Sequence, residues 1–523
     1  MNKKLILFVV SLLILAFAVS ASASSLTVGM SQEPVSLDPA AGLYIPEQFI
    51  IQQIYDPLIY ADPDLELHPA LATEWSVNEE GTEFSFTLRE GVKFHDGTDF
   101  TAEAVKVSFD RAAEGKSVAA ASPALLAGYA GTEVVDDHHV VVKFTTPHAT
   151  FLQDLTRPWL MISSPAAIEK YGDSYARNPI GTGPFIFKEW VAQEYVTVTK
   201  NEDYNWAPDF MNHQGPAYLD EVTFRFLPEA ATRLTAFEAG EAQIVQDPSY
   251  LEASFYADDP NASLYTFSAP GMTSHQMINT EKAPTDDINV RKAMIYAVDQ
   301  EQISQTAFYG LQPPAHSLIS PSTWGFSQEA DDMYRYDPEK AAELLEASGW
   351  VDSDGDGIRE KDGEKLHLEY PALPAYEEAF MELLAYYFSK VGFEVSITQL
   401  DDAGVSEWGY NNKHNIINMG WVSRDPSVID YTYNSANIEG GTESSYTRFR
   451  NEHFDELLNT APQTIDADAR EAMYQEIQVI AMENALLVPV HCYGSVYLTT
   501  ADVENFRFDP EGFPYMYEIT SAE

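Results

Sequence analysis

The chain has 523 residues, of which 45% are hydrophobic and 12% aromatic, a composition that supports packed cores and excludes a disordered protein. Its 81 acidic and 30 basic residues give a formal charge of −51, which excludes nucleic acid as a partner because phosphate binding needs clustered Lys and Arg. The single cysteine, Cys492, excludes an intramolecular disulfide and any multi-cysteine metal site.

Two explanations of the acidity are open. One is a high-salt habitat, in which cations screen the repulsion between carboxylates, and the other is the concentration of cationic ligands near the protein. Because the acidic residues are spread along the chain, we favour the high-salt explanation and expect an acidic surface typical of a halophile.

The first 23 residues have the features of a secretory signal peptide. Two lysines precede an apolar run over residues 5–19, and residues 21–23 offer small side chains to a signal peptidase. A membrane-spanning helix is the alternative, although the run is shorter than the roughly 20 apolar residues that cross a bilayer. We expect cleavage after Ala23 and secretion across the cytoplasmic membrane. No cysteine follows the run to carry a lipid anchor, so we expect a periplasmic or cell-surface protein.

Apolar periodicity and turn residues predict strands and helices that alternate along the chain, which is typical of an α/β fold. Strands are predicted at 26–30, 84–88, 139–144, 185–187, 195–199, 366–370, 395–400, 486–490 and 495–498. Helices are predicted at 101–111, 232–240, 289–298, 337–349, 377–391 and 471–483. The best marked is 337–349, because Asp caps its start, Pro takes the first helical position and Gly follows its end.

Four stretches are similar to one known family. They read PVSLDPA, FTLREGVKFHDGTDFTAEAVKVSFDR, NPIGTGPFIFKEW and EKAPTDDINVRKAMIYAVDQEQI, and they lie in the family's order. They resemble the solute-binding proteins of the peptide/nickel ABC importer family (solute-binding family 5), and the resemblance runs from about Leu26 to Glu518. It implies a two-lobe periplasmic-binding-protein-like fold (type II, large cluster, with an extra subdomain in lobe I) and a ligand cleft between the lobes. It also implies delivery of the ligand to ABC permease and ATPase subunits by a monomer.

The resemblance divides the chain into a signal peptide at 1–23, the lobe I core at 24–55, the extra subdomain of lobe I at 56–179, the continued lobe I core at 180–272, lobe II at 273–485 and a return to lobe I at 486–523. Catalytic motifs are missing from the sequence: there is no Gly-x-Ser-x-Gly elbow, His-Glu-x-x-His helix or Gly-x-Gly-x-x-Gly fingerprint. We therefore predict a binding protein and no enzyme, with a secreted hydrolase as a remote alternative.

The block from Gly420 to Pro426, with Trp421 and Arg424, is the expected ligand site because it follows the carboxyl end of the strand predicted at 415–419. In dipeptide-binding relatives an Asp three residues after the Trp grips the ligand's amino group, whereas Arg424 stands there in this chain. The block is closer to that of the nickel-type relatives, which hold metal inside a carboxylate-bearing chelate. A guanidinium presents a planar fork to carboxylates, so Arg424 suits either ligand. We expect an oligopeptide or dipeptide-like solute, with nickel or another metal chelate as the alternative.

The candidate ligand-binding residues are Trp421, Ser423, Arg424, Asp425, Trp408, Tyr44, Arg157, Trp159 and Tyr493. For Trp421 and Trp408, a place in the core and stacking on the ligand are both open. His275, His414 and His491 are candidate metal ligands or hydrogen-bonded histidines.

Three carboxylates two residues apart, Asp352, Asp354 and Asp356, match the first half of an EF-hand calcium loop. Position twelve of the loop is Gly363, where a bidentate Glu belongs. A structural calcium and an acidic turn are therefore both open, and no other cofactor is expected.

Overall fold

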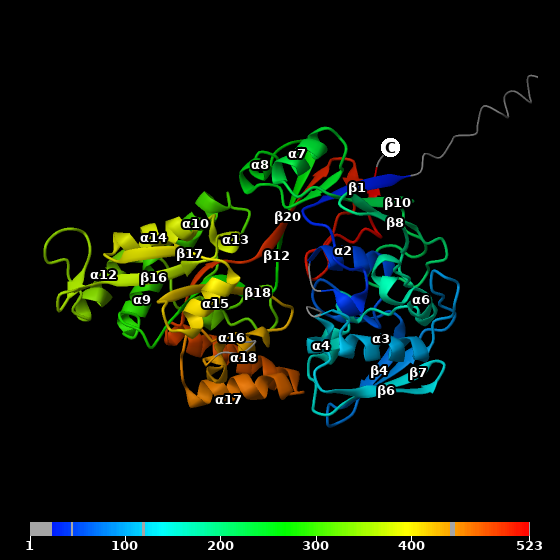
Figure 1. The fold of residues 1–523 in the computed structure, drawn as a ribbon, viewed down its shortest axis with the longest axis horizontal. Coiled ribbons are helices and arrows are strands. Elements are labelled where there is room, and N and C mark those ends of the chain that lie inside the picture. The colour runs from blue at the N-terminus through cyan, green and yellow to red at the C-terminus, as the bar shows by residue number, and fades with distance from the viewer. Residues whose placement is uncertain (1–23, 43–44, 118–120, 440–444, 522–523) are drawn as a thin grey trace, which may run out of the picture.

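The computed structural model describes residues 24–42, 45–117, 121–439 and 445–521, which form two α/β lobes (Figure 1). The predicted signal peptide and Tyr44 lie outside the described residues. The buried apolar side chains form one large core in each lobe, and the two cores have no residue in common. The expectation of a two-lobe α/β protein is confirmed.

The core of lobe I is a mixed seven-stranded sheet in the order β12-β20-β11-β1-β10-β9-β8. Strand β1, the first in the chain, is central in this sheet and runs parallel to its two neighbours β10 and β11, which come from much later in the chain. The elements of this part are β1 (Ser25–Met30), α2 (Ile45–Ile54), β8 (Phe185–Val191), β9 (Tyr195–Lys200), β10 (Glu221–Phe226), α7 (Ala230–Glu238), β11 (Ile244–Gln246), α8 (Tyr250–Ser254), β12 (Ala262–Ser268), β20 (Gly494–Thr500), β21 (Val503–Glu504) and β22 (Thr520–Ser521).

The extra subdomain of lobe I is built on an antiparallel sheet in the order β4-β5-β7-β6, against which α3 packs. Its elements are η1 (Pro39–Ala41), β2 (Ile59–Ala61), β3 (Leu67–Pro69), β4 (Ala72–Val77), β5 (Glu83–Leu88), α3 (Ala102–Glu114), α4 (Ser122–Leu125), β6 (Tyr129–Asp136), β7 (His139–Phe144), α5 (Phe151–Asp154), η2 (Pro158–Leu160), α6 (Pro165–Tyr171) and η3 (Gly172–Arg177). Phe84, Phe86 and Leu88 are buried while Ser85 is exposed, as expected for a half-buried strand.

Lobe II contains the sheet β18-β13-β19 and the parallel pair β16-β17. Its elements are β13 (Gly271–Ile278), α9 (Ile288–Ala297), α10 (Gln300–Ala307), α11 (Gln328–Asp331), α12 (Pro338–Ala347), β14 (Glu360–Lys361), β15 (Glu364–Lys365), β16 (His367–Ala372), α13 (Pro374–Glu377), α14 (Met381–Lys390), β17 (Glu394–Gln399), α15 (Asp402–Tyr410), β18 (Ile416–Val422), α16 (Val428–Tyr433), η4 (Ser435–Asn437), α17 (Glu452–Thr460), η5 (Ala461–Gln463), α18 (Ala467–Glu483) and β19 (Leu487–His491). The helix predicted at 377–391 corresponds to α14, which begins only at Met381, because Glu377 is the last residue of the separate short helix α13 and residues 378–380 form a turn.

Two antiparallel crossings join the lobes (Figure 1). The strands β12 and β20 pair in lobe I, and their continuations β13 and β19 pair in lobe II. Between them the amide of Ala269 donates to the carbonyl of Tyr493 at 2.8 Å. Strand β19 pairs in the sheet β18-β13-β19, whereas β20, which begins three residues later, pairs in the seven-stranded sheet; the predicted boundaries of the lobes stay a prediction.

Apart from the crossings, one place where the lobes touch is Gly81 of lobe I, where an added Cβ would lie 2.4 Å from Cδ1 of Ile465 in lobe II. In the described part of the chain, none of the helices combines the length and the apolar composition that a membrane span requires.

Candidate functional site between the lobes

A buried cluster of charged side chains joins the two lobes. Arg424, in the loop after β18 of lobe II, donates through Nη1 to Oγ1 of Thr156 in lobe I. Its Nε lies 3.3 Å from Oε1 of Glu511, a residue of the C-terminal segment that packs in lobe I. The same Oε1 lies 3.2 Å from Nε of Arg157, which stands between α5 and η2. One carboxylate oxygen thus lies between two guanidinium groups from different lobes.

The cluster is shielded from water. The side chains of Arg424 and Glu511 are 7% and 8% exposed, and that of Arg157 is 22% exposed. Ion pairs in such surroundings are screened less than surface pairs. A second carboxyl, that of Asp509, is fully buried beside them, and burial raises its pKa to about 7 although Arg424 acts in the opposite direction.

Aromatic residues lie next to this cluster in the chain. Trp421, at the end of β18, is 52% exposed, and its ring stacks with that of Tyr431 at a centroid distance of 6.3 Å. Gly420 packs against the hinge residue Tyr493, because a Cβ added there would lie 2.3 Å from the tyrosine ring. An exposed indole three residues before the buried Arg424 in the chain suits a site for a solute with an apolar and an anionic part.

Ser423 and Asp425 shape the loop that carries Arg424. The Ser423 amide donates to the carbonyl of Pro270 at 3.0 Å, and its hydroxyl donates to the carbonyl of Asp425 at 2.9 Å. The Asp425 carboxylate accepts from Arg470 at 2.6 Å and from the Ser427 amide at 2.9 Å. The bond to Pro270 reaches the crossing segment and the other contacts are internal to lobe II, so both residues have a structural role in the described structure.

The remaining aromatic candidates are not part of the cluster. Trp159 is 2% exposed in the core of lobe I, where its ring packs against Gly42. Trp408 is half-buried in α15. We therefore leave both residues out of the proposed site.

The three candidate metal-binding histidines are buried in lobe II. Burial lowers the pKa of each to about 4, so each is neutral at neutral pH. His275 bonds to Tyr433 and the Thr273 carbonyl, His414 to the Tyr446 carbonyl, and His491 to the Cys492 carbonyl. None of the three occurs in the groups of potential metal ligands that the described residues form.

The acidic loop of lobe II brings four carboxylates together. Oxygens of Asp352, Asp354, Asp356 and Glu360 lie within 4.8 Å of one another. Glu360 is position nine of the predicted loop, so it, and not position twelve, completes the group. Within the loop, Asp352 accepts from two backbone amides and Glu360 from Ser353. The calcium site stays a prediction.

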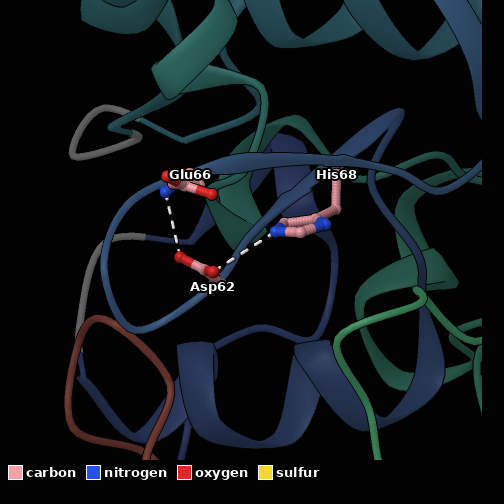
Figure 2. Close-up of side chains that lie close together, drawn as sticks. All are labelled: Asp62, Glu66 and His68. Atoms are coloured by element: carbon pink, nitrogen blue, oxygen red, sulfur yellow. Dashed lines mark hydrogen bonds and ion pairs between the residues drawn. The ribbon is translucent and has the colours of Figure 1, made fainter.

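A second group of potential metal ligands, Asp62, Glu66 and His68, lies at the β2–β3 hairpin (Figure 2). Asp62 accepts from the Glu66 amide at 2.9 Å and lies 3.2 Å from Nε2 of His68. The other ring nitrogen of His68 lies 2.7 Å from Asp209. Both ring nitrogens therefore have carboxylate partners already, and the group closes the hairpin.

Sequence reasoning missed Thr156, Glu511 and Asp509. Arg424 was found through a motif and Arg157 as an arginine beside Trp159, whereas Glu511 is one of 81 acidic residues and has no pattern of its own. Only the packing of the C-terminal segment against lobe I places it between the arginines.

The comparisons agree with this architecture. The family model "Bacterial extracellular solute-binding proteins, family 5 Middle" matches residues 66–442. The glutathione-binding protein GsiB of Salmonella paratyphi A is 27% identical over 503 residues, 94% of each chain. Heme-binding protein A of Haemophilus influenzae is 27% identical over 505 residues, covering 90% of this chain and 87% of its own. The structure of NikA from Brucella suis with Fe(III)-EDTA has a TM-score of 0.81 at 24% identity, covering 95% of this chain and all of NikA.

Proposed function

Because the chain belongs to the bacterial extracellular solute-binding proteins of family 5, we propose that it holds a small carboxylate-bearing solute between its lobes at Arg424 and Arg157. The protein is a substrate-binding protein of an ABC importer, and its family consists of transport-associated binding proteins that work with permease and ATPase components. The solute we favour is a dipeptide-like or oligopeptide-like molecule.

The observation that carries this proposal is the meeting of Arg424 and Arg157 from opposite lobes at one buried point. Guanidinium groups bind carboxylates through charge-assisted hydrogen bonds, which are stronger than neutral ones. Glutathione and heme, the ligands named for the two relatives, both carry carboxylates. A pair of arginines at the lobe interface suits such ligands.

Closure then couples capture to delivery. A solute held by Arg157 in lobe I and by Arg424 in lobe II has both contacts only when the lobes are closed. It therefore has a higher affinity for the closed form and shifts the population toward it. The stacked pair Trp421–Tyr431 supplies an apolar face for the rest of the solute.

A metal chelate is the second candidate. The three histidines are buried and hydrogen-bonded within lobe II and belong to none of the groups of potential metal ligands among the described residues, which favours a metal that arrives inside a carboxylate-bearing ligand over a metal bound by these side chains. The two arginines would then hold the carboxylates of the chelator. We also propose that residues 1–23 direct export and that the mature protein acts as a monomer outside the cytoplasmic membrane.

The test is native mass spectrometry of the purified protein, followed by calorimetry with the solute that co-purifies. Arg424→Ala is expected to weaken binding by about 1.5 to 3 kcal/mol, or about 10-fold to 150-fold. Arg335→Ala is the matched control, because that arginine is half-exposed and its ion pairs among the described residues are with Asp331 and Asp332, at and just after the end of α11. Unchanged affinity in Arg424→Ala would exclude the assignment.

A further inference from the structure

Several buried polar atoms of the charged residues at the lobe interface have no hydrogen-bond partner among the described residues. Glu511 Oε1 is close to both Nε atoms, but neither N–H is directed at it, so the buried Nε of Arg157 and of Arg424 have no hydrogen-bond partner among the described residues. Glu511 Oε2 is also buried without a donor there. Buried polar groups are nearly always hydrogen-bonded, so two donors and one acceptor together mark a place where a ligand supplies the partners.

The unused groups are of opposite kinds. The two N–H groups need an acceptor, and a ligand carboxylate provides one. The unpaired Oε2 of Glu511 needs a donor, which a ligand carboxylate cannot provide. If Glu511 were only an ion-pair partner of the arginines, their N–H groups would point at it.

The charges nearby lead to the same requirement. Arg470 is paired with Asp425, and Arg507 with Glu518, which leaves the two interface arginines beside Glu511 and the buried Asp509. A solute with carboxylates alone would add buried negative charge beside the Glu511 carboxylate. A solute whose ammonium group lies beside its carboxylate adds no net charge at that point.

We propose that Glu511 is a specificity-determining residue, which selects solutes that carry an ammonium group beside the carboxylate held by Arg157 and Arg424. This inference rests on the proposed function and narrows its ligand class. Free α-amino acids and the γ-glutamyl end of glutathione carry both groups on one carbon and satisfy both kinds of unused group, whereas a dipeptide such as Met-Leu does so only by bringing its two termini to the same point. Heme and aminopolycarboxylate chelates satisfy only the arginines.

The test compares free and blocked amines by calorimetry on the full chain. The probes are glutathione, the dipeptide Met-Leu, the N-acetyl form of each, hemin and Fe(III)-EDTA. The wild type is expected to bind at least one free-amine probe ten or more times more tightly than its acetylated form. Glu511→Gln should reduce that ratio below threefold, whereas Glu504→Gln, a change at an exposed glutamate of the same segment, should keep it.

Each outcome is decisive. Equal binding of free and acetylated probes by the wild type would overturn the inference, and this comparison holds even if Glu511→Gln does not fold. Tighter binding of free amines by Glu511→Gln would also overturn it, since Glu511 would then compete with the ligand. Binding of hemin or Fe(III)-EDTA alone would overturn the inference and leave the proposed function standing, whereas binding of no probe would overturn both.

Discussion

Asp56 ties the extra subdomain to the core of lobe I, and its replacement tests the packing of that junction. The carboxylate is fully buried. It accepts four hydrogen bonds from side chains that come from two distant parts of the chain: Tyr60 OH at 2.9 Å, Thr182 Oγ1 at 2.8 Å, Tyr204 OH at 3.2 Å and Trp206 Nε1 at 2.9 Å.

The expected loss of stability follows from the number of hydrogen bonds that Asp56 accepts. Asp56→Ala leaves four buried donors without an acceptor, and at about 1 kcal/mol for each the free energy of unfolding should fall by about 3 to 5 kcal/mol. Asp56→Asn keeps the shape but turns an NH₂ group toward two donors, so a loss of about 2 kcal/mol is expected. Asp64→Ala changes an exposed residue of the same segment and should cost less than about 0.5 kcal/mol.

The assay is urea unfolding followed by tryptophan fluorescence, repeated over a range of pH. Burial raises the pKa of Asp56 above its usual value of 3.8. A raised carboxyl pKa means that the stability contributed by this group is present below the unfolded pKa and is lost as pH rises through the folded pKa. The wild type should therefore lose stability relative to Asp56→Asn over that interval. A loss of less than 1 kcal/mol in Asp56→Ala, or the opposite pH trend, would refute the reasoning.

Three further predictions concern the hinge, the acidic loop and the surface. Gly271→Ala should lower both the free energy of unfolding and the ligand affinity, because φ is +117° there and the new Cβ would lie 2.3 Å from the carbonyl oxygen of Trp421. Urea unfolding and calorimetry measure the two effects. The control is Gly97→Ala, where φ is +84° but the new Cβ meets open space. If the predicted calcium site exists, calorimetry of the chelator-stripped protein will give a heat of calcium binding, and Asp354→Asn will remove it. No heat in the wild type would mean that residues 352–363 form an acidic turn that binds no calcium. Circular dichroism should show secondary structure retained better in molar salt than in dilute buffer, and equal stability in both would contradict the high-salt explanation.

Local signals were enough for much of the secondary structure. The helix α12 begins at Pro338 after the predicted cap Asp337, whose carboxylate accepts from the Lys340 amide at 2.9 Å. The helix predicted at 377–391 shows where such signals end. Glu377 accepts from the Leu373 amide and from two buried side chains of neighbouring strands, and the chain begins a new helix at Met381. Tertiary hydrogen bonds of this kind leave no periodic trace.

The candidate site divides in the same way. Arg424 was identified because it stands in a motif at a strand end, and the structure brings it to the lobe interface. Arg157 and Trp159 are two residues apart, yet the first lies in the charged cluster and the second in the core. Which of the two side chains lies at the interface and which in the core depends on how η2 packs, and no local sequence pattern encodes that packing. Glu511 is 87 residues from Arg424, and only the return of the chain to lobe I brings the two together.

The acidic surface and the buried arginines act over different distances. At physiological salt the Debye length is about 8 Å, so the repulsion between a charge of −51 and an anionic solute falls off within a few molecular layers, and more steeply in molar salt. The arginines act at contact, in a site where screening is weak. For a solute bound as proposed, the surface therefore affects mainly the rate at which it arrives, and the affinity depends on the interface cluster. A zwitterionic solute of the proposed kind is not repelled by the acidic surface, because its net charge is near zero while it approaches. Its carboxylate and ammonium groups then meet the arginines and Glu511 only after the lobes close around it.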